Sequence, residues 1–103
     1  MQFAVVSGKE KGRIYRFQLA KKLVIGRAKE CDFVLNDARI SKRHAEMEVS
    51  RNSVVIYDLD SKNSTYVNGV PIRGRHKLED EDTLLIGETE LRLRFDKDEI
   101  LAG

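Results

Sequence analysis

Three polar segments of the chain carry side chains suited to binding an anion and a peptide. Arg27 follows a short apolar run, and its planar guanidinium can bind two oxygens of a phosphate or a carboxylate. Ser41 lies in the segment 36–44 and offers a hydroxyl together with a free backbone N–H. Asn63, in the segment 59–65, has an acceptor and two donors, which suits binding to a peptide main chain. These residue types indicate a site that divides its work between charge and backbone recognition.

Positive charge gathers around these residues, although the chain as a whole is close to neutral. Lys42 and Arg43 follow Ser41, and Lys62 precedes Asn63. The formal net charge is only +2, with 19 Lys and Arg residues mixed among 17 Asp and Glu residues. This balance does not resemble the basic tail or stripe of a general nucleic-acid binder. The aromatic residues also read mainly as strand residues, so we expect a local anion site and no nucleic-acid partner.

The polar residues do not form a convincing catalytic or metal site. Ser41, His44 and Asp58 could act as nucleophile, base and orienting group of a hydrolase. The short spacing from serine to histidine does not secure their hydrogen-bond geometry, however, and no nucleophile-elbow pattern is present. His44, His76 and Cys31 lack the spacing of metal ligands. We therefore expect no enzyme activity, no metal and no cofactor.

The elements that must position these residues are predicted to be strands. Short runs rich in β-branched and aromatic residues alternate with turn signals along the chain, and no segment shows three clean turns of helical periodicity. The runs are residues 2–8, 12–20, 23–26, 33–35, 44–49, 53–59, 65–67, 70–72, 83–87 and 90–95. Many short strands with frequent turns predict an all-β sandwich or barrel.

Several turns between these runs are predicted to close hairpins. The charged segment 8–12, bounded by glycines, and the pair Arg51-Asn52 are expected to join neighbouring strands. Asn68-Gly69 is the strongest turn signal, because this pair readily supplies two residues of positive φ. Pro71 follows it and marks an edge strand, because proline has no N–H to give to a ladder. The last turn is expected at Glu88-Thr89.

Long polar connections gather at the ends of sheets, where binding residues are usually carried. The connection that begins with Arg27 and the two segments 36–44 and 59–65 stand out among these connections. If the strands beside them run antiparallel, all three open on one edge of the sandwich. We therefore expect their side chains to form one site.

Length and composition predict one compact domain. The chain has 103 residues, of which 41% are hydrophobic and 35% charged. Cys31, the only cysteine, cannot form an internal disulfide and is expected to be a small, partly buried apolar residue. No apolar run approaches the roughly 18 residues of a membrane span, and the N-terminus reaches charged residues too soon for a signal peptide. We expect a cytoplasmic chain without a membrane partner, with its domain over residues 1–96 and a helical or frayed tail over 97–103.

Three sequence blocks resemble a known family. "IGR" at 25–27, "ISKRHAEM" at 40–47 and "DLDSKNSTYVNG" at 58–69 resemble the Gly-Arg, Ser-x-x-His and Asn-x-Thr-x-Val-Asn-Gly blocks of the forkhead-associated domain. "EDEDTLLIGETELRLRF" resembles the closing pair of strands of that family. The order and spacing of the blocks agree with those of the family, and the resemblance covers roughly residues 1–95, which is nearly the whole chain.

The resemblance implies a fold and a function. The implied fold is an SMAD/FHA-like β-sandwich of two antiparallel sheets with about eleven strands and with binding loops at one edge. The implied function is recognition of phosphothreonine in partner proteins, and therefore phosphorylation-dependent protein interaction in signalling. A phospho-independent interaction or oligomerisation module on the same fold is the alternative, and as an isolated domain we expect a monomer.

The resemblance also assigns roles to the polar residues. Arg27 and Ser41 would bind the phosphate, Lys42 would add a contact, and the Lys62 ammonium would stand where the family often has a small hydroxyl residue. Asn63 would bind the peptide backbone. Arg39 and Arg43 are candidates for reading an acidic side chain downstream of the phosphothreonine. Gly26, His44, Thr65, Asn68 and Gly69 would shape the site, His44 by joining loops through its ring nitrogens.

One position departs from the family pattern. Ser64 stands where the family usually has glycine after the asparagine. If this position requires positive φ, a serine is strained by about 1 to 2 kcal/mol. The loop around Asn63 is then expected to carry strain.

Overall fold

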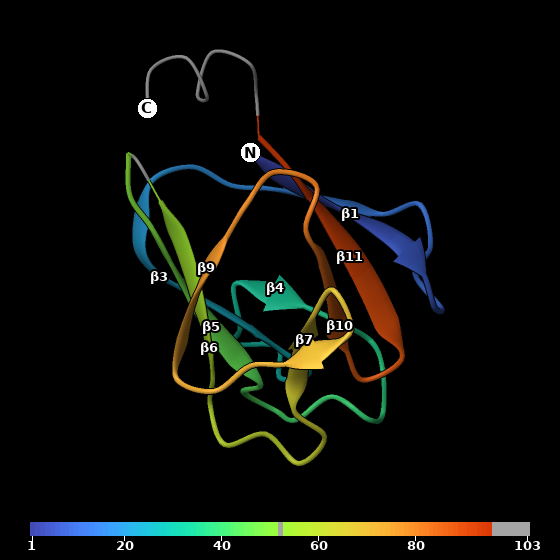
Figure 1. The fold of residues 1–103 in the computed structure, drawn as a ribbon. Coiled ribbons are helices and arrows are strands. Elements are labelled where there is room, and N and C mark those ends of the chain that lie inside the picture. The colour runs from blue at the N-terminus through green and yellow to red at the C-terminus, as the bar shows by residue number, and fades with distance from the viewer. Residues whose placement is uncertain (52, 96–103) are drawn as a thin grey trace.

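The protein is a β-sandwich built from eleven strands in the part of the chain that the structure describes, residues 1–51 and 53–95 (Figure 1). We describe a computed structural model. The strands are β1 (Gln2–Ser7), β2 (Ile14–Arg16), β3 (Ala20–Gly26), β4 (Phe33–Val34), β5 (Ala45–Val49), β6 (Val54–Asp58), β7 (Thr65–Val67), β8 (Val70–Pro71), β9 (Arg75–Leu78), β10 (Thr83–Ile86) and β11 (Thr89–Arg94). The predicted tail 97–103 and the predicted turn residue Asn52 lie outside the described residues. Over residues 1–51 and 53–95, no helix is long and apolar enough to cross a membrane.

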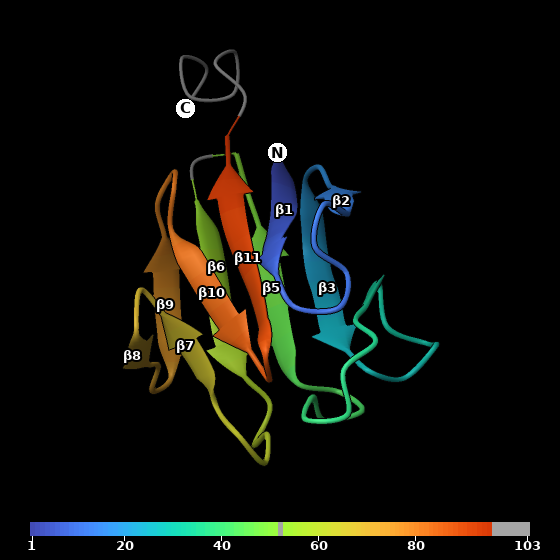
Figure 2. The same cartoon turned by 90° about the vertical axis from the view of Figure 1, so that its right-hand side faces the viewer.

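Two sheets lie face to face, which confirms the predicted fold class (Figure 2). One sheet has the strand order β2-β1-β11-β10-β7-β8, and the other has the order β4-β3-β5-β6-β9. Alternating residues of both sheets point inward, as in β11, where Leu91 and Leu93 are buried while Arg92 and Arg94 are exposed. Full burial of an aliphatic or aromatic side chain contributes about 1.5 to 3 kcal/mol, so this alternation holds the sheets together.

One strand pair differs from the expectation of purely antiparallel sheets. The short strand β4 pairs in parallel with β3, Ile25 opposite Phe33. The loop between them folds back on itself, because Cys31 N–H donates to Ala28 O at 3.0 Å and Asp32 N–H donates to Val24 O at 2.9 Å. The chain therefore re-enters beside β3 in the same direction after only a few residues.

The predicted hairpins are present. β1 pairs with β2, β5 with β6, β7 with β8 and β10 with β11, all antiparallel. Pro71 lies in β8, at the edge of its sheet, as predicted. The last turn falls one residue earlier than expected, at Gly87-Glu88, because Ile86 pairs with Thr89 and Gly87 takes φ +63°.

Strand β9 was not predicted from the sequence. It pairs with β6 at the edge of the second sheet, and Leu78 is its only buried residue. Its other side chains are charged or polar, which is common in edge strands because charge discourages further pairing. Arg75 binds Glu48 on β5 through two hydrogen bonds of 3.1 and 2.8 Å, which holds the strand against its sheet.

Candidate functional site

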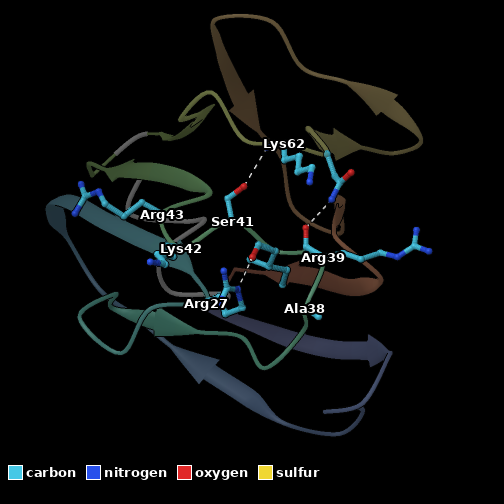
Figure 3. Close-up of a pocket in the computed structure, with 9 residues that line it drawn as sticks. Arg27, Ala38, Arg39, Ser41, Lys42, Arg43 and Lys62 are labelled. Atoms are coloured by element: carbon cyan, nitrogen blue, oxygen red, sulfur yellow. Dashed lines mark hydrogen bonds between the residues drawn. The ribbon is translucent and has the colours of Figure 1, made fainter.

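Three loops meet at one end of the sandwich, opposite the N-terminus in Figure 1. They are the β3–β4 loop (27–32), the β4–β5 loop (35–44) and the β6–β7 loop (59–64). Together they enclose an open pocket of about 770 Å³ (Figure 3). Its lining residues are Arg27, Ala38, Arg39, Ile40, Ser41, Lys42, Arg43, Lys62 and Asn63. Every residue that the sequence singled out for ligand contact lines this pocket, and Ala38 and Ile40 are additions.

Arg27 is held in place by the neighbouring loop. Its backbone N–H donates to Ser41 O at 3.1 Å, and its Nε donates to Ile40 O at 2.9 Å. The side chain is exposed on the pocket wall, and no hydrogen bond of its two terminal nitrogens occurs among residues 1–51 and 53–95. The guanidinium is therefore fixed in orientation while its terminal donors remain open to a ligand.

Gly26 allows the two loops to approach closely. A Cβ at this position would lie 2.2 Å from Lys42 O and 2.9 Å from the Cys31 sulfur. The same carbonyl accepts hydrogen bonds from Ala28 N–H at 3.1 Å and from Cys31 Sγ at 3.0 Å. Cys31 is buried, and burial raises the pKa of its thiol. Glycine before Arg27 is thus required by packing between loops.

Ser41 forms two hydrogen bonds, and one of them shows that the expectation of a free backbone N–H was wrong. Its backbone N–H is not free, because it donates to His44 Nδ1 at 3.0 Å. Its Oγ accepts a hydrogen bond from Lys62 N–H at 3.0 Å, which ties the β4–β5 loop to the β6–β7 loop. Because Oγ is an acceptor in that bond, its own proton remains to be donated into the pocket. The hydroxyl, rather than the backbone N–H, is the donor that Ser41 can offer.

His44 is fully buried and joins the same two loops through both ring nitrogens. Nδ1 accepts from Ser41 N–H, so the ring proton lies on Nε2, which donates to Ser64 O at 2.8 Å. Ser41, His44 and Asp58 therefore do not form a hydrolase triad. Ser41 Oγ is bonded to Lys62 rather than to His44, and Asp58 Oδ1 is 3.9 Å from Nε2.

Asp58, the last residue of β6, holds the two ends of the β6–β7 loop together through its carboxylate. Its carboxylate accepts from Ser61 N–H at 2.8 Å, from Ser61 Oγ at 2.5 Å and from Thr65 Oγ1 at 2.8 Å. Burial acts to raise the pKa of Asp58, but these hydrogen bonds and the nearby His44 outweigh it and lower that pKa. Thr65, which the sequence placed among the site-shaping residues, is buried and acts through this carboxylate.

Ser64 has φ +66°, the left-handed conformation foreseen for this position. A non-glycine residue costs about 1 to 2 kcal/mol there. The strained backbone places Ser64 O on His44 Nε2, so that hydrogen bond offsets part of the cost.

Asn63 bridges two loops and still presents polar atoms to the pocket. Its Nδ2 donates to Arg39 O at 2.8 Å (Figure 3). One amide hydrogen and the Oδ1 acceptor remain, which is the combination that a peptide main chain can pair with. Lys62 beside it is exposed on the pocket wall.

The β10–β11 turn packs against the β4–β5 loop, and this contact was not predicted from the sequence. Asp37 is buried and accepts from Arg39 N–H at 2.9 Å, Glu88 N–H at 2.7 Å and Thr89 Oγ1 at 3.0 Å. Burial acts to raise the pKa of Asp37, but these hydrogen bonds outweigh it and lower that pKa. A Cβ on Gly87 would lie 2.9 Å from Asp37 Oδ2, so the turn packs directly on the loop. Nothing in the local sequence pointed to this contact, because Glu88 lies 51 residues from Asp37 along the chain.

Asn68 and Gly69 do not line the pocket. They form the β7–β8 turn with φ of +50° and +85°. The Asn68 amide donates to Asp82 Oδ1 at 2.9 Å and accepts from Thr83 N–H at 3.0 Å. The pair therefore fixes a hairpin beside the site rather than its rim.

The electrostatics of the pocket favour an anionic ligand. No Asp or Glu lines the pocket, whereas five lining residues are cations: Arg27, Arg39, Lys42, Arg43 and Lys62. Outside the lining, Glu88 pairs with Arg39 at 3.0 Å. Within the described ranges, no group of three or more His, Cys, Asp or Glu side chains is arranged to hold a metal ion. The site thus combines positive charge with a fixed guanidinium and a hydroxyl donor.

Known proteins with similar sequences share this fold. The family model described as FHA domain matches residues 23–87. The FHA domain-containing protein FhaA of Mycobacterium tuberculosis is 32% identical over 84 residues, which are 82% of this chain and 16% of that protein. The chain therefore spans only a small part of the length of this relative.

Two solved structures superpose closely. One, from a structural and functional analysis of phosphothreonine-dependent FHA domain interactions, has a TM-score of 0.83 and 29% identity over 92% of this chain and 95% of that one. The other is the FhaA FHA domain complexed with the intracellular domain of Rv3910, with a TM-score of 0.79 and 30% identity over 88% of this chain and 96% of that one. The family model matches residues 23–87, which is more than half of the chain, and the solved FHA domains share its fold, so the chain belongs to the forkhead-associated (FHA) domain family.

Proposed function

We propose that this domain binds phosphothreonine in partner proteins and thereby makes an interaction depend on phosphorylation. One observation carries the proposal: the Arg27 guanidinium and the Ser41 hydroxyl, from different loops, line the same cationic pocket. Similar FHA domains have been described in phosphothreonine-dependent interactions and in a complex with a partner's intracellular domain, which supports the proposal. The domain acts as a recognition module rather than as an enzyme.

Phosphate chemistry matches the donors in the pocket. A phosphothreonine carries about −1.5 to −2 charges at pH 7 and three strong acceptor oxygens. The terminal nitrogens of Arg27 supply a planar fork for two of these oxygens, and the Ser41 hydroxyl supplies a third donor. Lys42 and Lys62 line the same wall and add positive charge. Aspartate is a poor substitute, because it offers fewer oxygens and less charge.

The rest of the peptide is held through its backbone. Asn63 presents an acceptor and a donor beside Lys62, and the bond to Arg39 O fixes its orientation. Three or four charged hydrogen bonds, less the cost of ordering an extended peptide, give a dissociation constant on the order of micromolar.

The proposal extends to the setting of the domain. Residues 1–96 form the binding unit, which acts as a monomer when isolated. Its place is the cytoplasm, and the buried, reduced Cys31 is compatible with a reducing compartment.

Calorimetry with one peptide in three forms tests the function. The phosphothreonine form should bind, whereas the threonine and aspartate forms should bind at least about a hundredfold more weakly. Arg27→Ala should remove binding of the phosphothreonine form while the domain remains folded. Equal affinity for the phosphorylated and unphosphorylated forms would favour a phospho-independent interaction module instead.

A further inference from the structure

We propose that Arg43, together with the shared Lys42, forms a second anion-binding subsite beside the phosphate site. The ligand class is then a phosphothreonine peptide that carries a second anionic group, either a carboxylate or another phosphate. This inference rests on the proposed function and narrows it to a class of partner.

The charge of the pocket exceeds what one phosphate needs. Five cations line it, whereas a phosphothreonine brings only about two negative charges. Arg39 is already compensated, because its Nε lies 3.0 Å from Glu88 Oε1. Arg27 and one lysine suffice to balance the phosphate. Arg43 and a second lysine are left over on the pocket wall.

The surplus charge lies on one side of the phosphate site. Figure 3 shows Lys42 and Arg43 on the side of Ser41 that faces away from Arg39 and Lys62. Both side chains are exposed, and neither forms an ion pair or a side-chain hydrogen bond within residues 1–51 and 53–95. They are available to a ligand without first leaving an internal partner.

The backbone that carries this pair is firmly anchored. Lys42 O accepts from Ala28 N–H at 3.1 Å and from Cys31 Sγ at 3.0 Å, and His44, directly after Arg43, is fully buried. The backbone of the two cations is therefore fixed, so that binding an anion has to order only their side chains.

No carboxylate of the described residues forms an ion pair with Arg43. Glu30 and Asp32 belong to the β3–β4 loop, which borders the same pocket. Neither carboxylate comes within ion-pair distance of Arg43 in the described part of the chain. This differs from the situation of Arg39, which has Glu88.

Peptide geometry fits a spacing of two residues. The Cα atoms of Ser41 and Arg43 are separated by two peptide units, so they lie at most about 7.6 Å apart. In an extended peptide, residues two apart point to the same side and are separated by about 7 Å. A phosphate at Ser41 and a second anion at Arg43 can thus belong to side chains two positions apart in one bound strand.

The test compares peptides that share one phosphothreonine. A reference peptide has alanine at all flanking positions, and others carry glutamate or a second phosphothreonine two positions before or after it. The readout is the ratio of dissociation constants of reference and doubly anionic peptides, so any general loss of affinity cancels. For the natural chain we expect one of the two directions to bind about tenfold more tightly than the reference. The glutamate and phosphate peptides show which anion the subsite prefers.

Substitutions at Arg43 assign the effect. Arg43→Ala should reduce the ratio to about one, and Arg43→Glu should reverse it and favour a peptide with lysine at that position. Arg92→Ala, which removes an exposed cation from β11, should leave the ratio unchanged. A ratio near one for the natural chain, or a tenfold ratio that survives in Arg43→Ala, would overturn the subsite. In both cases the reference peptide still binds, whereas a reference peptide that does not bind refutes the proposed function and the subsite with it.

Discussion

Ser41 and His44 are joined by a hydrogen bond of 3.0 Å from the Ser41 backbone N–H to Nδ1 of the buried imidazole. The opposite ring nitrogen donates to Ser64 O at 2.8 Å. One side chain therefore fixes the relative positions of two loops that both contribute to the pocket. Because the contact to Ser41 is made by the backbone, the hydroxyl stays directed to other partners. His44 itself is buried and does not line the pocket, so it acts on the pocket only through these two loops.

Replacing His44 should damage both stability and binding. His44→Ala leaves Ser41 N–H and Ser64 O without their partner and opens a cavity, so the free energy of unfolding should fall by about 2 to 4 kcal/mol. Chemical denaturation measures this loss. The exposed His76 is the matched control, and His76→Ala should change stability by no more than about 0.5 kcal/mol. Similar stability of the two variants would contradict the role given to His44.

A side chain on Gly26 should separate the loops. The Cβ of Gly26→Ala would lie 2.2 Å from Lys42 O, a backbone atom that cannot move alone. The variant should lose about 1 to 3 kcal/mol of stability, and its affinity for a phosphothreonine peptide should fall with the displaced Arg27. Gly74→Asn is the control, because a Cβ there meets nothing within 4 Å and asparagine tolerates its φ of +66°. Unchanged affinity in Gly26→Ala would show that the loop contact does not position Arg27.

The sheets were predictable from local patterns. Strands such as β6 and β11 alternate buried and partly exposed residues, and Asn68-Gly69 demands a tight turn. Strand β9 escaped prediction because its charged residues show no alternation, and its pairing with β6 is set by the sheet edge rather than by local preference.

The site was predictable in its membership but not in its connections. Arg27, Ser41 and Asn63 stand out by residue type and by their place in polar loops. The partner of the Ser41 N–H and the contact from Asp37 to Glu88 depend on tertiary packing, which residue types alone do not reveal. The expectation of a free N–H at Ser41 was wrong, because nearly all buried backbone N–H groups in folded proteins have a hydrogen-bond partner.

Glycine at position 64 should stabilise the domain. Ser64 has φ +66°, so Ser64→Gly removes about 1 to 2 kcal/mol of strain from the folded state. Glycine also raises the conformational entropy of the unfolded chain, which offsets part of this gain. We expect a net gain of about 0.5 to 1 kcal/mol with peptide affinity preserved, since the bond to His44 uses only the backbone carbonyl. Ser53→Gly, at a position without positive φ, should not stabilise, and equal effects of the two changes would argue against strain at Ser64.

Acid should weaken the loops that form the pocket, through Asp37 and Asp58. Burial acts to raise the pKa of each carboxyl, but hydrogen bonds outweigh it and lower both pKa values below the unfolded value of about 3.9. A lowered folded pKa means that the stabilisation is fully present above the unfolded pKa and is lost as pH falls through the folded pKa. The free energy of unfolding should therefore decline between about pH 5 and pH 2.

Neutral variants separate this effect from general acid denaturation. Asp37→Asn and Asp58→Asn should each be less stable than the natural chain at pH 7 and should lose less stability between about pH 5 and pH 2, because one titrating group is gone. Asp60→Asn is the matched control, because Asp60 is exposed, its side chain forms no hydrogen bond among residues 1–51 and 53–95, and asparagine tolerates its φ of +53°; it should keep the full decline. Urea titrations at several pH values measure these slopes. A decline equally steep in Asp37→Asn and in the natural chain would show that this carboxylate does not hold the β4–β5 loop to the β10–β11 turn.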